Sequence, residues 1–153
     1  MNVNSLIQHI RFAHKANNVL MVWGAPGIGK SAASQEAADI LATDFNLPGG
    51  VIEYGDDAPE GFTIDQCFGV IDVRLSQCDP VDVGGLPYKT SRQTQGRLVP
   101  DWFPSTDRAD MPERGLLLLE EIVSAPLSVQ AAAYQLTHDR RIGDGSPRRR
   151  SAQ

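Results

Sequence analysis

The chain has 153 residues, a net charge of −5 and 41% hydrophobic residues, which is enough for one globular domain with its own core. The acidic balance argues against a protein that holds nucleic acid by overall positive charge, so we expect no nucleic-acid partner. No stretch approaches the roughly 18 apolar residues that a membrane-spanning helix needs, and the sequence therefore predicts a cytoplasmic protein without membrane contact. Cys67 and Cys78 have no Cys or His close by at metal-ligand spacing, and we expect them to be reduced packing residues.

The first predicted elements are a helix and a buried strand. Apolar residues recur at helical spacing between Leu6 and Ala13 and predict an amphipathic helix over residues 4–16. The unbroken apolar run at residues 19–23 is typical of a strand buried on both faces of a parallel sheet. We expect Trp23, at the end of this run, to be a core residue.

A second helix and a second strand follow along the chain. Residues 30–43 are rich in alanine and predict a helix. Residues 51–66 are acidic and turn-prone, and we expect a surface connection there. Alternation of apolar and polar residues over 68–75 predicts the second strand.

The second half of the chain begins with a long segment rich in glycine and proline. Residues 79–114 predict a long functional loop or hairpin. Residues 115–119 predict a third buried strand, and Pro126 opens a helix that runs to about Asp139. The order of these elements predicts an α/β fold, with a mainly parallel sheet flanked by helices.

The segment between the first predicted strand and the second helix carries the pattern of a phosphate-binding loop. Gly-x4-Gly-Lys-Ser is matched by Gly24, Gly29, Lys30 and Ser31. Glycines let backbone N–H groups curl around a phosphate, and the helix that follows adds its N-terminal partial positive charge. Lys30 would supply a point charge to the β and γ phosphates, and Ser31 a hydroxyl ligand to Mg²⁺. The alternative is a glycine turn with an exposed lysine, which the flanking elements disfavour.

Two carboxylates, Glu120 and Glu121, directly follow the third predicted strand. In ATPases with a phosphate-binding loop, one such carboxylate holds the water shell of the metal and the other polarises the attacking water. Glu120 departs from the more usual Asp at the first of these positions. The alternative is a pair of solvated carboxylates that closes a strand.

Three segments together resemble the MoxR branch of the AAA+ ATPases: Gly24-Ala-Pro-Gly-Ile-Gly-Lys-Ser31, Gly115-Leu-Leu-Leu-Leu-Glu-Glu-Ile122 and Ala125-Pro-Leu-Ser-Val-Gln-Ala-Ala-Ala-Tyr-Gln-Leu136. The resemblance covers residues 4–143, and its third segment is the most specific. It implies that Ser31 and Glu120 position Mg²⁺ and that Glu121 activates water. It also implies an ATP-binding loop formed by Gly24, Ala25, Pro26, Gly27, Ile28, Gly29, Lys30, Ser31 and Ala32.

The activity implied by the resemblance is ATP hydrolysis coupled to remodelling or maturation of a partner protein. Members usually act as rings, often hexamers, so the resemblance implies a homo-oligomer. Nothing in the sequence identifies the client protein. A second interpretation, from another functional class, is a nucleotide-binding module that binds ATP without appreciable turnover.

The resemblance ends after Arg140-Arg141-Ile142-Gly143, where family members continue into a sensor strand, an arginine finger and a helical lid. We therefore expect residues 1–143 to form a nucleotide-binding domain that is incomplete at its C-terminus. Residues 144–153 have almost no apolar side chain, which predicts a disordered basic tail. In the family's sheet the missing strand lies between the strands predicted at 19–23 and 115–119, so we expect each of these to expose an unpaired edge.

Overall fold

A computed structural model describes residues 2–25, 27–89, 95–105 and 108–142 of the chain. The tail predicted at residues 144–153 and Pro26 of the predicted loop lie outside these ranges. None of the described helices is long and apolar enough to cross a membrane.

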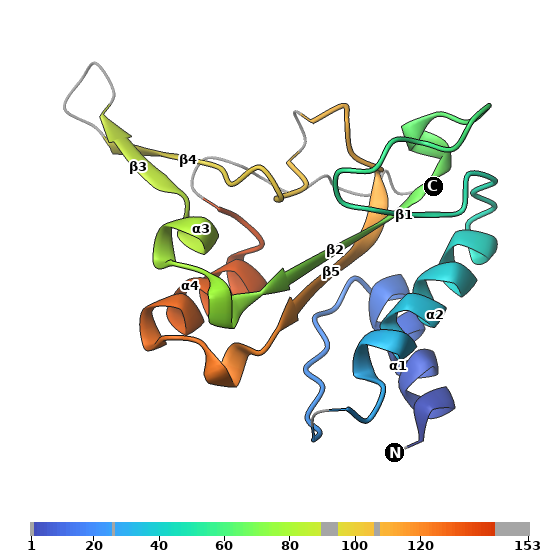
Figure 1. Ribbon diagram of the computed structural model, residues 1–153, viewed down its shortest axis with the longest axis horizontal. Helices are drawn as coiled ribbons and strands as arrows, with labels where there is room; N and C mark the ends of the chain where they lie inside the picture. Colours follow the sequence, from blue (N-terminus) through green and yellow to red (C-terminus); the bar gives the residue numbers. More distant parts are fainter. Residues whose placement is uncertain (1, 26, 90–94, 106–107, 143–153) are drawn as a thin grey trace. The chain divides into compact units, whose positions relative to one another are not determined.

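The main sheet has three strands, β1 (Val51–Glu53), β2 (Phe68–Arg74) and β5 (Arg114–Glu120), in the order β1-β2-β5 (Figure 1). β1 runs parallel to β2, with Val51 opposite Phe68. The predicted second and third strands are therefore confirmed, and so is the α/β class with a parallel sheet flanked by helices.

Four α-helices and a hairpin complete the described regular structure, together with three short 3-10 turns. The helices are α1 (Val3–Lys15), α2 (Lys30–Asp44), α3 (Pro80–Gly84) and α4 (Leu127–Asp139). The hairpin strands are β3 (Leu86–Lys89) and β4 (Gln95–Leu98), and the turns are η1 (Ile64–Gln66), η2 (Leu75–Gln77) and η3 (Ile122–Ser124). The long helices agree to within one or two residues with those predicted at 4–16, 30–43 and 126–139.

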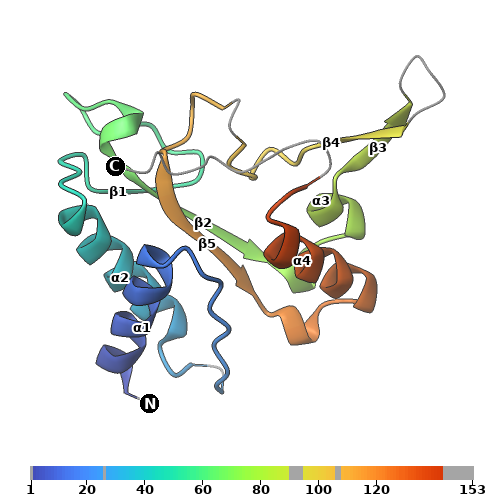
Figure 2. The ribbon, with the colours of Figure 1, turned by 180° about the vertical axis from the view of Figure 1, so that it is seen from behind.

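The chain forms two compact units, and strands β2 and β5 pass from one unit into the other. The first unit comprises residues 1–70 and 112–116. Helices α1 and α2 lie side by side in it (Figures 1 and 2), and Ile7 shares one buried cluster with Ala33 and Ala37, which are fully buried. Small alanine side chains let the two helices approach closely, which accounts for the alanine-rich sequence of α2.

The second unit comprises residues 71–111 and 117–153 and has its own core. Leu75 from η2, Val83 from α3 and Val129 from α4 are fully buried in one cluster. Trp102 packs at the edge of this cluster, and its indole Nε1 donates a hydrogen bond of 2.9 Å to the backbone carbonyl of Asp82.

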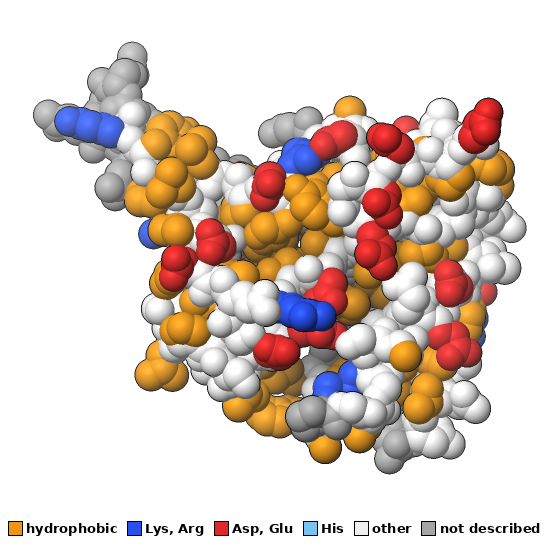
Figure 3. All heavy atoms as spheres, viewed as in Figure 1, with side chains coloured by type: hydrophobic (Ala, Val, Ile, Leu, Met, Phe, Trp, Pro, Cys, Tyr) orange, Lys and Arg blue, Asp and Glu red, His pale blue; other side chains and the backbone are white. Residues whose placement is uncertain are grey.

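The segment predicted as a loop or hairpin contains both α3 and the antiparallel pair β3–β4, in which Leu86 lies opposite Leu98. The prediction of a hairpin is thus confirmed. Leu86, Tyr88 and Leu98 are between 41% and 54% exposed, and hydrophobic side chains gather over part of the described hairpin in the space-filling view (Figure 3).

The strand predicted at residues 19–23 is wrong. These residues are irregular and belong to no strand of the part of the chain that the structure describes. Met21 is 47% exposed and Trp23 is 72% exposed, so the expectation of a core tryptophan is also wrong. The physical reason is that backbone pairing with a distant strand makes a buried strand, and the apolar pattern of residues 19–23 alone does not reveal whether such a pairing forms.

Residues 51–66, predicted as a surface connection, contain strand β1 and turn η1. β1 has only three residues, which is too short for a periodic pattern to reveal. Its neighbour β2 supplies the pairing that makes it a strand.

The two cysteines are free thiols, and Cys67 is buried, as predicted for a packing residue. Burial raises the pKa of the Cys67 thiol and, together with the carboxylates of Asp82 and Asp79, that of Cys78. Neither thiol is therefore activated as a nucleophile at neutral pH.

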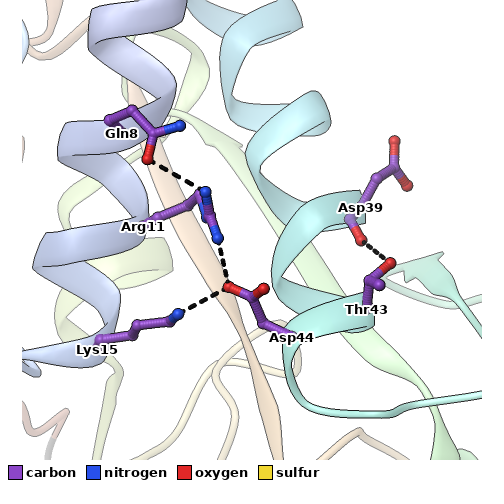
Figure 4. Close-up of polar contacts among 6 residues, drawn as sticks. All are labelled: Gln8, Arg11, Lys15, Asp39, Thr43 and Asp44. Atoms are coloured by element: carbon purple, nitrogen blue, oxygen red, sulfur yellow. Dashed lines mark hydrogen bonds and ion pairs between the residues drawn. The ribbon is translucent and has the colours of Figure 1, made fainter.

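One network of charged side chains joins α1 to α2 (Figure 4). Arg11 Nη2 lies 2.7 Å and Lys15 Nζ lies 2.8 Å from Oδ2 of Asp44. Arg11 also donates a hydrogen bond of 3.1 Å to Gln8 Oε1, which fixes its guanidinium group. The hydrogen bonds from Lys15 and then Arg11 hold the pKa of the Asp44 carboxyl below its usual value.

We predict that Asp44→Asn destabilises the protein at neutral pH but not in strong acid. A carboxyl with a lowered folded-state pKa stabilises the fold above its unfolded pKa of about 3.9 and loses this contribution as the pH falls through the folded value. Urea unfolding at several pH values between neutral and strong acid should therefore show a gap between wild type and variant that closes on acidification. Asp39→Asn on the same helix is the control, because the carbonyl of Asp39 and not its carboxylate accepts the bond from Thr43. A gap of the same size at every pH would contradict the prediction.

Candidate nucleotide-binding site

The loop that precedes α2 has the backbone that its glycines predict. Gly27 has φ of 77° and Gly29, the N-cap residue of α2, has φ of 85°. Residues with a Cβ rarely adopt this left-handed conformation, whereas glycine does so without steric cost. At both positions the space that a Cβ would enter is open, so the two glycines present bare backbone.

The first glycine of the pattern serves a different purpose. A Cβ at Gly24 would lie 2.3 Å from Cδ1 of Ile28, so the Ile28 side chain folds against the bare backbone of Gly24. The loop is thereby curled back on itself.

Lys30, the first residue of α2, bends back across this loop. Its Nζ donates hydrogen bonds of 2.9 Å to the backbone carbonyls of Gly24 and Ala25. Both acceptors are neutral groups, so these contacts hold the ammonium group at the loop without neutralising its charge.

The N-terminus of α2 is suited to an anion. Gly29 has no side chain to cap the helix, and the first turn contains no acidic residue. The first amides of an α-helix lack an intrahelical acceptor, and the helix dipole places partial positive charge at this end. Ser31, in the first turn, is exposed and carries the hydroxyl predicted to bind Mg²⁺.

The predicted acidic pair follows β5 directly. Glu120 is the last residue of the strand, and Glu121 has a left-handed backbone with φ of 58° and ψ of 31°. Such a conformation costs a residue with a Cβ roughly 1–2 kcal/mol, and residues of this kind persist where their surroundings fix them. The carboxylate of Glu121 accepts a hydrogen bond from the hydroxyl of Ser76 in η2.

Sequence reasoning missed Ser76. A signal was available, because Ser76 comes two residues after the end of β2, and β2 and β5 are neighbours in a parallel sheet. Parallel strands end at the same edge, so polar residues just beyond both strands are brought together.

The predicted site residues divide between the two units. The loop from Gly24 to Ala32 belongs to the first unit, whereas Glu120 and Glu121 belong to the second. Among the described residues, no group of three or more His, Cys, Asp and Glu side chains is arranged to hold a metal ion. The joint magnesium site of Ser31 and Glu120 stays a prediction.

Comparison with known proteins gives no match: neither a protein-family model, nor a curated protein, nor a solved structure matches this chain. The functional assignment therefore rests on the chemistry of the loop and of the acidic pair. The resemblance to MoxR-type ATPases stays a prediction based on the three motif segments.

We predict that Ser76 and Glu121 are energetically coupled. Hydrogen bonds to charged groups contribute about 1.5–3 kcal/mol when buried, and partial exposure here lowers the expected coupling to about 1 kcal/mol. A double-mutant cycle of Ser76→Ala and Glu121→Gln, measured by urea unfolding, gives this value directly. Ser124→Ala, at the other end of η3, is a matched serine control and should show no coupling to Glu121→Gln. Additive effects of Ser76→Ala and Glu121→Gln would contradict the contact.

Proposed function

We propose that this chain binds a nucleoside triphosphate, ATP in the first instance, together with Mg²⁺, through the loop from Gly24 to Ala32. The observation that carries the proposal is the left-handed backbone of Gly27 and Gly29 directly before an uncapped helix N-terminus. The ammonium group of Lys30 lies on the same loop. Bare backbone, a helix dipole and a cation all favour a phosphate anion at one place.

Lys30 is poised to exchange its acceptors. Its present partners, the carbonyls of Gly24 and Ala25, are neutral. A phosphate oxygen carries negative charge, and hydrogen bonds between ionised groups are roughly twice as strong as those between neutral ones. No carboxylate has to be displaced from the first turn of α2, which contains none.

The hydroxyl of Ser31 is the side-chain oxygen that would hold Mg²⁺ beside the loop. Magnesium prefers oxygen ligands and keeps several of its waters, so it needs few protein ligands when phosphate oxygens are present. Glu120 would hold one of these waters, as the resemblance implies. When bound, the ion neutralises negative charge on the phosphates.

Hydrolysis of the bound nucleotide is the second candidate function, with Glu121 as the residue that activates water. It is favoured by the strained backbone of Glu121 and by its hydrogen bond from Ser76, which fix the carboxylate. Rapid turnover is disfavoured, because residues 19–23, which lead into the loop, are irregular and, apart from the half-buried Val22, exposed. Catalytic groups need positions fixed to within about 0.5 Å, which elements of the sheet provide better than irregular segments. We therefore propose ATP binding as the main function and the MoxR branch of the AAA+ ATPases as the family.

We predict that Lys30→Ala weakens binding of Mg·ATP roughly 10- to 100-fold in isothermal titration calorimetry. The estimate follows from the loss of a hydrogen bond between charged groups, about 1.5–3 kcal/mol. Lys89→Ala, which removes an exposed lysine from strand β3, is the matched control and should bind as wild type does. Equal affinity of wild type and Lys30→Ala would remove the basis of the proposal.

Phosphate release from the same samples separates the two candidate functions. We expect little or no release from wild type at a nucleotide concentration that saturates the loop. Rapid release that Glu121→Gln abolishes would instead make hydrolysis the main function.

A further inference from the structure

Strand β5 lies at the end of the main sheet, with β2 on one side and no strand of the described chain on the other. An edge strand presents a row of unpaired N–H and C=O groups that can pair with another chain. Proteins commonly block such an edge with a lysine, a proline or a charge in mid-strand. Between its two terminal residues β5 carries only Gly115 and four leucines, so nothing of this kind blocks its edge.

The leucines of β5 are incompletely covered. Leu116, Leu117, Leu118 and Leu119 are all half-buried, whereas a run of four leucines is typical of a strand buried on both faces. Leu116 packs against the buried cluster that contains Ile7 and Ala33. Leu117 and Leu119 pack against buried clusters of the second unit. The strand therefore keeps apolar surface to offer to a partner.

The charges of β5 are complementary to those of a second copy of the same strand. Arg114 opens the strand and Glu120 closes it. In an antiparallel pair centred on Leu117, Arg114 of each copy lies opposite Glu120 of the other. Directly opposite residues point to the same face of a sheet, so Arg114, whose guanidinium lies 4.6 Å from the centroid of the Phe45 ring, can exchange that contact for an ion pair with Glu120. A parallel pair in register would instead bring arginine beside arginine and glutamate beside glutamate.

The leucines and the glycine fit the same register. Leu116 lies opposite Leu118 in the antiparallel pair, which places apolar side chains together. Gly115 lies opposite Leu119, where the absence of a side chain leaves room for the leucine. Gly115 also approaches β2 closely, since a Cβ there would lie 2.3 Å from the carbonyl oxygen of Gly69.

We propose that two copies of this chain associate by antiparallel pairing of their β5 strands. The two three-stranded sheets then form one sheet across a twofold axis, with the same surface used by both copies. Glu120 belongs both to this edge and to the predicted magnesium site, so the association is measured in the absence of nucleotide and Mg²⁺.

Charge reversal tests the pairing. Arg114→Glu or Glu120→Arg alone places like charges opposite each other at both ends of the paired strands. Mixing the two single variants in equal amounts gives opposite charges at both ends, and so does the double variant Arg114→Glu/Glu120→Arg. In sedimentation equilibrium we expect a wild-type dimer, a dissociation constant at least about tenfold higher for each single variant, and recovery in the mixture and in the double variant.

A cross-link tests the register without any change of charge. Residues directly opposite in an antiparallel pair have Cα atoms about 4.5–5.5 Å apart, which a disulfide can span. Leu117→Cys should therefore form a disulfide between two copies under mild oxidation, identified at position 117 by peptide mass spectrometry. Leu119→Cys, two residues along the same face, is the control and should not form one.

Three results would overturn the proposal. One is a wild-type protein that stays monomeric at every concentration. The edge of β5 is then covered by residues 19–23 or by a different protein, and not by a second copy. Another is a dimer that neither charge reversal weakens. The third is a cross-link that forms equally at positions 117 and 119.

Discussion

The hydrogen bonds from Lys30 to the carbonyls of Gly24 and Ala25 are the interaction on which the candidate site depends. They require the chain to double back between Gly24 and the start of α2, and only left-handed glycines at positions 27 and 29 allow this turn at low cost. The same turn leaves α2 without a side-chain cap. One backbone path therefore brings together the bare amides, the dipole of α2 and the ammonium group of Lys30.

The end of the main sheet at β5 is the second constraint on the structure. Among the described strands β5 pairs only with β2, and the apolar residues 19–23 pair with none. Local sequence favours a strand in both places, but only β5 has a neighbour that satisfies its backbone. The proposed pairing of two copies would satisfy the β5 edge.

Much of the fold follows from local sequence. The periodic pattern from Leu6 to Ala13 defines α1 because a helix bonds within itself, and the alanines of α2 act in the same way. Strands depend on distant partners, which explains why residues 19–23 were assigned wrongly and β1 was missed. The glycines and Lys30 could be predicted because turn geometry is local. The contact between Ser76 and Glu121 joins residues that are far apart in the chain, so it could be predicted only once β2 and β5 were known to be neighbours in a parallel sheet.

The most direct measurement of the central claim is the change in backbone amide NMR shifts when inorganic tripolyphosphate with Mg²⁺ is added to the ¹⁵N-labelled chain. Tripolyphosphate carries the phosphate chain without base or sugar, so it tests the loop alone. We expect the largest changes at Gly27, Gly29, Lys30 and Ser31, and little change along the β3–β4 hairpin. No change at the loop, or changes that are equal across the chain, would contradict phosphate binding at this site.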